Sequence, residues 1–310
     1  MTAESLTVGG TARKRRGVRE VRKAVESGIQ VVFLLCGTLA VGFVLLISIY
    51  LILSGLPAIQ QIGLADFLFG RVWDPTNATT GAEFGILPFI LTSIYGTAGA
   101  VVLGVPVGLL TAVYLAKIAP PKVAVAIRTA VQLLAGIPSV VYGLVGMIVL
   151  VPAIQRTFSL SSGACLLAAM IVLAIMILPS IINVAENALR AVPKEYEEAS
   201  LALGATKLET YFKVTLPAAG SGVAAAIVLG VGRAIGEAMA IIMVSGNVSN
   251  MPSIFAPVRF LTTGIVSGMG YAQVGSLYHQ ALFSIGLVLF LFIMLINVLL
   301  NVLIKKKGDA

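Results

Sequence analysis

The sequence has few charged residues: only 11% of its 310 positions are Asp, Glu, Lys or Arg. Soluble globular domains carry about 25% charged residues, so this chain lacks the polar side chains that would cover a soluble fold. Hydrophobic residues make up 58% of it instead. The composition therefore predicts an integral membrane protein. The formal net charge is +8. In a membrane protein the placement of the charges along the chain matters more than their sum, so we do not take this charge as a sign of nucleic-acid binding.

Residue types that build catalytic and metal sites are also scarce. The chain has one histidine, His279, and two cysteines, Cys36 and Cys165. Both cysteines fall in apolar segments, which is typical of small core residues and not of a disulfide or metal pair. His279 has no partner at metal-ligand spacing, and no catalytic triad or paired-carboxylate site is evident. We therefore expect a chain that is not an enzyme and that holds no metal.

Long apolar runs are what the chain has instead. Six of them can span about 30 Å of hydrocarbon, which takes about 20 helical residues each. They do not alternate between polar and apolar positions, which argues against a membrane-spanning β-barrel. We therefore expect an all-α, polytopic membrane protein with six transmembrane helices. The predicted spans are residues 29–53, 87–116, 129–153, 163–183, 218–245 and 281–304.

The basic residues are distributed unequally between the two sides of this six-span arrangement. Seventeen of the 21 lie before the first span, after the last, or in the loops after spans two and four, whereas the other side has three. The positive-inside rule then places both termini in the cytoplasm. The first apolar run is longer than the roughly 7–15 residues of a signal-peptide core, so we do not expect it to be cleaved.

Four segments follow from these spans. Residues 1–28 are basic, and they either lie on the anionic inner leaflet or form a solvated, disordered tail. Pro106 and Pro138 fall inside the second and third spans, where each either kinks the helix or breaks it beside a cavity. The segments are a basic cytoplasmic N-terminal segment (1–28), a first transmembrane helix with an external loop (29–86), a five-helix permease core (87–304) and a basic cytoplasmic tail (305–310).

The cytoplasmic loop 184–217 is more ordered than a linker between two spans needs to be. Pro193 and three early glutamates predict a helix over 194–203 that ends at Gly204, and a second helix is expected over 207–215. Small residues such as Ala199 would let another protein approach the backbone closely. The alternative is an amphipathic hairpin that rests on the chain's own spans.

This loop resembles the EAA signature of ABC-importer permeases, E-A-A, three residues, G, nine residues, I-x-L-P. The chain departs from it at Ser200, in place of alanine, and at Val214, in place of isoleucine. In that family the first loop helix sits in a groove on a separate ATPase subunit. The resemblance thus assigns ATPase coupling to Glu198, Ala199, Gly204, Leu216 and Pro217.

Four further stretches resemble the phosphate-specific branch of these permeases, and in particular its PstC-type subunits. They are FGILPFILTSIYGT from Phe84, GIPSVVYGLVG from Gly136, GRAIGEAMAIIMVSGN from Gly232 and GSLYHQALFSIGLVLF from Gly275. The resemblance implies the MetI-like permease core of a type I ABC importer, in the plasma membrane of a bacterium or archaeon. It also implies a PstA-type permease as heterodimer partner, a PstB-type ATPase dimer and a PstS-type phosphate-binding protein.

The chain itself carries no G-x-x-x-x-G-K-[ST] phosphate loop, because GATKLET from Gly204 has the wrong spacing. We therefore expect no cofactor in this chain, with ATP and magnesium bound by the partner ATPase.

Arg233 and Glu237 stand out because they fall within a long apolar segment. Arg233 follows Pro217 by about 24 Å of helix, which places it at mid-membrane, where an arginine costs about 2.5–3.5 kcal/mol to insert. Glu237 is one helical turn further on and is expected to pair with it. A guanidinium matches phosphate oxygens, so we expect Arg233 to line the substrate pathway and Glu237 to hold it between transport events. The alternative is a buried ion pair that fixes helix packing.

Ser139 is a weaker pathway candidate, because its hydroxyl could contact substrate or could satisfy the backbone beside Pro138. Three other functions stay open at this point. They are a permease for another oxyanion such as sulfate or molybdate, a membrane signalling or scaffold protein that keeps a docking loop, and a secondary transporter.

Overall fold

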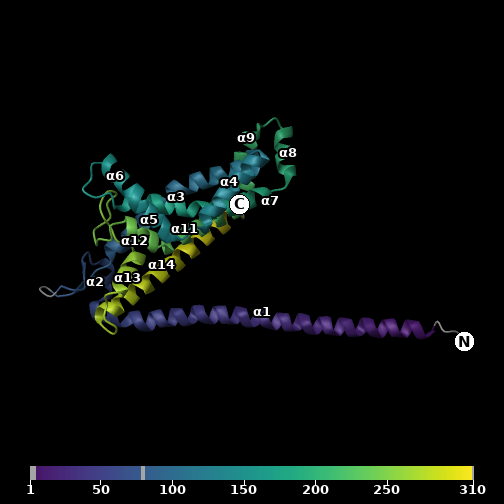
Figure 1. The fold of residues 1–310 in the computed structure, drawn as a ribbon, viewed down its shortest axis with the longest axis horizontal. Helices are drawn as coiled ribbons and strands as arrows, with labels where there is room; N and C mark the ends of the chain where they lie inside the picture. Colours follow the sequence, from purple (N-terminus) through teal and green to yellow (C-terminus); the bar gives the residue numbers. More distant parts are fainter. Residues whose placement is uncertain (1–4, 78–80, 309–310) are drawn as a thin grey trace. The chain divides into compact units, whose positions relative to one another are not determined.

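The computed structural model of the chain describes residues 5–77 and 81–308 (Figure 1). The chain divides into two compact units between Leu53 and Ser54. Nearly all described elements are helices, which confirms the all-α prediction; the strands are β1 (Trp73–Asp74) and β2 (Glu83–Phe84), which pair antiparallel. The first four residues of the predicted N-terminal segment and the last two of the predicted tail lie outside the described residues.

The described part of the first unit is one helical segment, the portion of α1 (Ser5–Ile62) up to Leu53, which is basic at its start and apolar after it. α1 runs without a break through the described part of the basic segment and the first predicted span. That part is therefore helical, and it is not the disordered tail that was one of the two alternatives. From Ile29 to Leu53 the large apolar side chains are exposed, with Phe33 at 71%. Apolar residues on every side suit a helix that is surrounded by lipid.

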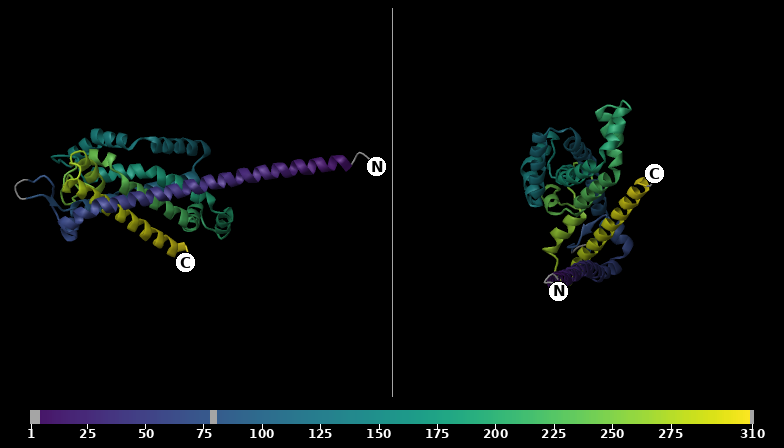
Figure 2. Two further views of the ribbon diagram at one scale, coloured as in Figure 1. Left: turned by 90° about the horizontal axis from the view of Figure 1, so that it is seen from below. Right: turned by 90° about the vertical axis from the view of Figure 1, so that its right-hand side faces the viewer.

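The second unit is built around α3 (Leu87–Val113) and α7 (Leu166–Ala191), which pack along each other, with α11 (Gly220–Gly236) against both (Figures 1 and 2). Glycines bring α3 close to α7. A Cβ atom at Gly104 would lie 2.9 Å from Ile177, and one at Gly108 would lie 2.8 Å from Ile181. Close approach over small residues is a usual way for membrane helices to associate, since van der Waals contact replaces the hydrophobic effect there.

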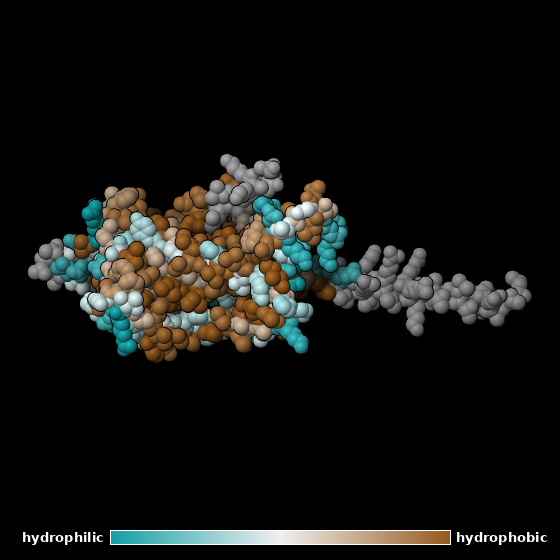
Figure 3. All heavy atoms as spheres, turned by 90° about the horizontal axis from the view of Figure 1, so that it is seen from above, coloured by the Kyte–Doolittle hydropathy of each residue, from teal (hydrophilic) through white to brown (hydrophobic). Residues whose placement is uncertain are grey.

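Five described helical segments are long and apolar enough to cross a membrane, and a sixth span results if one pair bent by 74° is counted as one. The apolar belt is visible in Figure 3, where hydrophobic side chains cover most of the face shown and hydrophilic ones gather toward its two ends. The segments are Glu26–Ile62, Leu87–Ile118, Ser139–Thr157, Leu166–Ala191 and Leu277–Leu299, with Lys207–Ala218 and Gly220–Gly236 as the bent pair.

The third span differs from its prediction over 129–153. α4 (Pro121–Gly136) is a separate helix, and the span begins after it, at Ser139. Pro138 explains the break, because proline lacks an N–H and forces the residue before it into an extended conformation, as Ile137 adopts. The span consists of α5 (Ser139–Val145), the π-helical turn η2 (Gly146–Leu150) and α6 (Val151–Thr157). Pro106, by contrast, lies within an unbroken α3.

The fifth span, expected to be continuous over 218–245, is interrupted twice. The chain bends by 74° between α10 (Leu216–Ala218) and α11. It then leaves the helical conformation at Glu237 and resumes it in α12 (Met239–Val244). The two segments that follow the breaks pack against each other: a Cβ at Gly143 of α5 would lie 2.9 Å from Ala240 of α12.

The second unit has two structured ends (Figures 1 and 2). At one end lie the loop helices and the carboxyl end of α14 (Leu277–Gly308). At the opposite end, α2 (Leu64–Phe69), the β1–β2 hairpin and α13 (Leu261–Met269) form a small core with Phe67, Trp73 and Phe89. The loop helices are α8 (Lys194–Ala202) and α9 (Lys207–Thr210), followed by the turn η3 (Tyr211–Thr215); the turn η1 (Tyr114–Ile118) ends the second span.

Candidate functional site

Arg233 lies in the last turn of α11, where a positive charge is favoured by the helix dipole. Its Nη1 donates a long hydrogen bond, 3.4 Å, to the Ser180 hydroxyl of α7. Among the described residues no carboxylate forms an ion pair with it. A guanidinium in a membrane-spanning segment is therefore held by one hydroxyl and a helix terminus, which leaves most of its donors available for an anion.

Glu237 does not pair with Arg233, which corrects the expected ion pair. The helix that was expected to carry both ends at Gly236, and Glu237 is the extended residue after it. Its carboxylate accepts a hydrogen bond from the Ala240 N–H (3.0 Å), and its carbonyl accepts one from the Thr262 hydroxyl (2.7 Å). Glu237 thus caps α12 and fixes the interruption in the span. A four-residue spacing predicts a shared face only where the helix continues.

One side chain on α5, that of Tyr142, lies near Arg233. The Tyr142 hydroxyl is within electrostatic range of the guanidinium and donates to the Leu134 carbonyl (2.7 Å) at the end of α4. Ser139 lies one turn earlier on α5, so it shares a face with Tyr142. Ser139 is half-buried, and its hydroxyl has no hydrogen-bond partner among the described residues. α11, α7 and α5 therefore bring Arg233, Ser180 and Tyr142 into one region, and Ser139 shares the face of α5 that carries Tyr142.

The predicted coupling residues lie on and around the loop helices. Glu198 and Ala199 are exposed on α8, Leu216 is half-buried in α10, and Pro217 is exposed beside it. Gly204 ends α8 with a φ of +87°, a left-handed conformation that costs other residues energy, and a Cβ there would touch nothing. The glycine is thus required by the turn between the helices, whatever contacts it makes with a partner.

A second glutamate anchors the loop, and the motif did not identify it. Glu197 of α8 forms a 2.5 Å ion pair with Lys117 of η1 and accepts a hydrogen bond from Thr215 of η3. Both members of the ion pair are mostly buried, at 19% and 12% side-chain exposure. Ser200, the departure from the EAA pattern, shares a 2.9 Å hydrogen bond with the buried Thr210 of α9. The serine hydroxyl therefore ties the two loop helices together.

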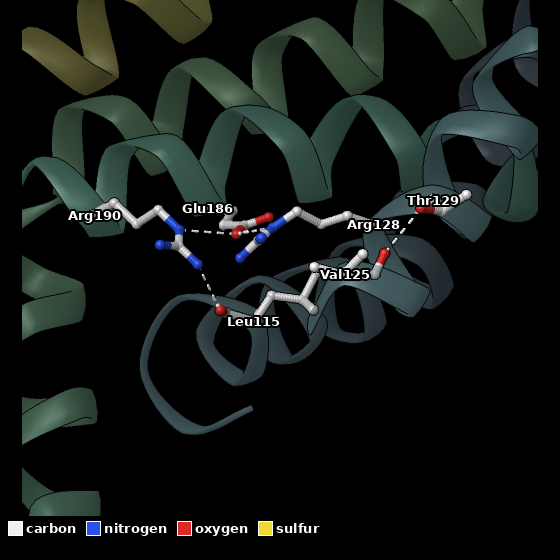
Figure 4. Close-up of polar contacts among 6 residues, drawn as sticks. All are labelled: Leu115, Val125, Arg128, Thr129, Glu186 and Arg190. Atoms are coloured by element: carbon white, nitrogen blue, oxygen red, sulfur yellow. Dashed lines mark hydrogen bonds and ion pairs between the residues drawn. The ribbon is translucent and has the colours of Figure 1, made fainter. Parts of the chain in front are cut away.

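A third polar cluster lies between α4 and α7 (Figure 4). Glu186 of α7 is buried, and its Oε1 accepts from the Nε atoms of Arg128 (2.7 Å) and Arg190 (2.9 Å). Arg190 also donates to the Leu115 carbonyl (3.0 Å) in η1. The sequence analysis placed both arginines on the cytoplasmic side but gave them no role. Their shared partner follows from the tertiary packing of α4 against α7, which a single sequence does not reveal.

Comparison with known proteins relates this geometry to transport. Residues 104–307 match the family of binding-protein-dependent transport system inner membrane components. The chain is 38% identical to the probable ABC transporter permease protein YqgH of Bacillus subtilis, with 93% of each chain covered. It is 35% identical to the phosphate transport system permease protein PstC of Pasteurella multocida, over 78% of this chain and 81% of that protein. It is 30% identical to the probable PstC protein of Methanocaldococcus jannaschii, over 92% of both.

Solved structures support the same fold. A chain of the MetNI methionine ABC transporter, in an inward-facing conformation, superimposes with a TM-score of 0.57. The match covers 72% of this chain and 95% of that one at 21% identity, and so it speaks to the fold alone.

Proposed function

The chain belongs to the family of binding-protein-dependent transport system inner membrane components, and we propose that it is the permease subunit that carries phosphate across the membrane in an ATP-driven importer. A second, PstA-type permease completes the pathway. The relatives named as phosphate permeases, in a bacterium and an archaeon, support the choice of substrate. The same relatives support the plasma membrane of a bacterium or archaeon as the location of the chain.

The observation that carries this proposal is that Arg233 lies in a membrane-spanning segment with one hydroxyl group as its hydrogen-bond partner. A charge within a membrane span is costly unless it is paired or serves a substrate. Arg233 has no carboxylate partner among the described residues and lies where two spans are interrupted. Its free N–H groups can bind two oxygens of a phosphate anion side by side. The hydroxyl groups of Ser180 and Ser139 supply further donors, while the absence of tighter protein contacts lets the anion leave.

ATP hydrolysis takes place on a partner in this proposal. Ala199 and Gly204 let the ATPase approach α8 closely, and exposed apolar side chains surround them, among which Leu203 is 89% exposed. Exposed apolar groups on a loop with many charges mark a protein interface. The chain supplies the docking surface, whereas ATP and magnesium bind the PstB-type ATPase dimer. The apolar members of this surface are Tyr196, Leu203, Leu208 and Phe212.

The orientation follows from the charges and from the two ends of the second unit. The loop helices and the carboxyl end of α14 share one end (Figures 1 and 2); the loop helices and the turn η3 carry Lys194, Lys207 and Lys213, and the last turn of α14 contains three consecutive lysines, Lys305 to Lys307. The positive-inside rule assigns that end to the cytoplasm. The hairpin end then faces outward, where a PstS-type protein delivers phosphate. The basic N-terminal segment lies on the cytoplasmic side by the same rule.

Uptake of labelled phosphate tests the proposal. The chain is assembled with its partner permease, ATPases and binding protein in proteoliposomes, and ATP-dependent uptake is measured. We expect Arg233→Gln to assemble normally and to lower uptake by about tenfold or more, because hydrogen bonds to charged groups contribute about 1.5–3 kcal/mol. The matched control is Arg71→Gln, an exposed arginine at the hairpin end, which should transport like the wild type.

The outcomes separate the rival functions. Excess unlabelled sulfate or molybdate that suppresses uptake as strongly as phosphate would identify a general oxyanion permease. No ATP-dependent uptake by the complete wild-type complex would favour a scaffold or signalling protein. Normal uptake by a well-assembled Arg233→Gln complex would remove Arg233 from the pathway.

A further inference from the structure

The hairpin end of the second unit contains an open cavity of about 470 Å³. Its lining residues come from the hairpin, the segments after α12 and α13, and the start of α14, and these elements lie at the end opposite the loop helices (Figures 1 and 2). The residues that line it carry hydroxyl, amide and guanidinium groups, and none carries a carboxylate. Its polar lining includes Thr76, Asn247, Ser249, Arg259, Tyr271 and Tyr278.

Arg259 is the charged group of this cavity. It is half-buried, and no ion pair of this arginine occurs among the described residues. Its Cζ lies 5.7 Å from the centre of the Phe89 ring, which supports a cation from its face. Burial lowers the pKa of the guanidinium below its usual value, and the nearby Tyr278 acts in the opposite direction. A partly desolvated cation without a counter-charge gains from binding an anion.

The backbone holds this arginine in a fixed orientation. Its Nε and Nη2 donate to the Asn247 carbonyl at 3.1 and 2.7 Å, and Nε also donates to the Asn247 side chain at 3.0 Å. Asn247 has a φ of +51°, a left-handed conformation that asparagine tolerates better than most residues. Nη1 takes part in none of these bonds. A purely structural buried arginine would be expected beside a carboxylate, whereas this one keeps one edge of its fork available.

From this geometry we infer an outer oxyanion site: the cavity around Arg259 binds phosphate at the external mouth before the anion reaches Arg233. The inference rests on the proposed function. The Arg259 Nη1 group and nearby hydroxyl groups donate to the phosphate oxygens, and the ring of Trp73, which packs 6.1 Å from that of Tyr278 between centroids, forms an apolar wall. None of the lining residues carries a carboxylate, which limits repulsion of the anion. The Thr76 hydroxyl already donates to the Asp74 carboxylate (3.3 Å), so the donors left for phosphate are those of Arg259 and the other lining residues.

Protection from thiol labelling tests occupancy without transport. Ser249→Cys places a thiol in the cavity, in a chain whose Cys36 is replaced by serine. The complete complex is depleted of ATP, and a membrane-impermeant maleimide is added from outside in phosphate or in chloride at equal ionic strength. We expect phosphate to slow labelling. We expect Arg259→Gln to raise the phosphate concentration for half-protection by roughly tenfold, because it removes a charge-assisted donor.

Two comparisons keep the test specific. Arg259→Lys keeps the positive charge but loses the planar guanidinium that can bind two oxygens side by side. The phosphate concentration for half-protection in this variant should therefore lie between those of the parent and of Arg259→Gln. Arg156→Gln removes an exposed arginine outside the cavity. In this variant phosphate should protect the thiol at position 249 at the same concentration as in the parent. Equal labelling in phosphate and chloride would overturn the site, and so would protection that is unchanged in Arg259→Gln. If phosphate slowed labelling only in complexes that contain the external binding protein, the outer site would be overturned, because contact with that protein would then be what covers the thiol.

The parallel uptake assay keeps the two proposals apart. Phosphate import by the parent complex without any protection at position 249 would remove the outer site and leave the proposed function intact. If phosphate protected position 249 but the parent complex did not import phosphate, the proposed transport function would be contradicted, whereas the anion site around Arg259 would stand.

Discussion

At the scale of single residues, Glu186 is a buried carboxylate that forms ion pairs with two arginines. One oxygen atom of a buried carboxylate faces two guanidinium groups (Figure 4). The two arginines are 32% and 46% exposed in their side chains, so water screens part of their charge. Without the carboxylate, Arg128 and Arg190 would repel each other across the junction of α4 and α7.

We therefore predict that Glu186→Gln destabilises the purified complex by about 1–3 kcal/mol, below the usual cost of breaking a fully buried pair because both arginines reach solvent. The measurement is thermal unfolding in detergent. Arg128→Gln combined with Glu186→Gln should recover part of the loss, since the remaining Arg190 keeps its bond to the Leu115 carbonyl. Glu83→Gln, at an exposed glutamate, is the control. Unchanged stability in Glu186→Gln would show that the cluster does not stabilise the fold.

Sequence reasoning at this scale found the charges but not their partners. Arg233 was noticeable because an arginine in an apolar run is rare. Its contact with Ser180 depends on how α11 packs on α7, 53 residues apart in the sequence. Glu237 was given the wrong partner, because its backbone leaves the helix that the four-residue spacing assumed. The transport roles of Arg233, Glu237 and Ser139 stay predictions.

At the scale of elements, the broken spans mark the limit of hydropathy. The apolar runs around Pro138 and Glu237 look continuous, but the structure divides both of them. The break between α4 and α5 can be anticipated from Pro138, because proline constrains the conformation of the residue before it. The break at Glu237 gave little signal, because it depends on a side-chain cap and on Thr262, 25 residues later.

The loop helices were better predicted, because their boundaries are set by local residues. Pro193 and Gly204 delimit α8 as expected, and Thr206 begins α9 with a capping box to Glu209. The attachment of α8 to the membrane helices was not predicted. Glu197 binds Lys117 in η1, the turn that ends the second span, and Tyr211 donates to the Lys117 carbonyl (3.3 Å). The ion pair between Glu197 and Lys117 therefore joins α8 directly to that span.

We predict that Lys117→Met leaves ATPase binding intact but lowers phosphate uptake by about 5- to 150-fold, the range of typical coupling free energies. The docking surface is unchanged, whereas the link from α8 to the second span is lost. ATPase co-purification and uptake are measured together.

The exchange Lys117→Glu with Glu197→Lys should restore uptake at least in part. Lys213→Met is the matched control, because its ion pair with Glu209 is exposed on the same loop and contributes little. Full uptake in Lys117→Met, or loss of the ATPase from it, would contradict this account.

At the scale of the whole molecule, the second unit is a membrane core with two unlike ends. One end carries basic residues and an exposed apolar docking surface. The other carries an aromatic core and a cavity without carboxylates. An importer needs this polarity, because the anion enters at one face and ATP is used at the other. The family resemblance drawn from the EAA-like loop is confirmed by the match over residues 104–307.

The fold class and family could be predicted because they depend on composition, apolar run length and local motifs, all of which are written along one chain. The cavity around Arg259 could not, because it brings together Trp73, Asn247, Arg259 and Tyr278 from segments up to about two hundred residues apart. Contacts of that range are decided by tertiary packing, which a single sequence does not reveal.

The orientation of the chain gives the last prediction. Leu208 lies on the loop-helix end and is 60% exposed, and Val274 lies on the hairpin end and is 84% exposed. In a chain with Cys36→Ser, we predict that an impermeant thiol reagent added outside intact cells labels Val274→Cys and not Leu208→Cys. The reason is the concentration of basic residues at the loop-helix end, which the positive-inside rule keeps in the cytoplasm.

Permeabilised cells provide the control, since both cysteines should then react at similar rates. Labelling of Leu208→Cys alone in intact cells would invert the protein and place the docking surface away from ATP. Labelling of both cysteines in intact cells would mean that positions 208 and 274 lie on the same side of the membrane, so that no single span separates them. The first result would also remove the external mouth from the cavity around Arg259, because Val274 lies three residues after Tyr271, which lines that cavity.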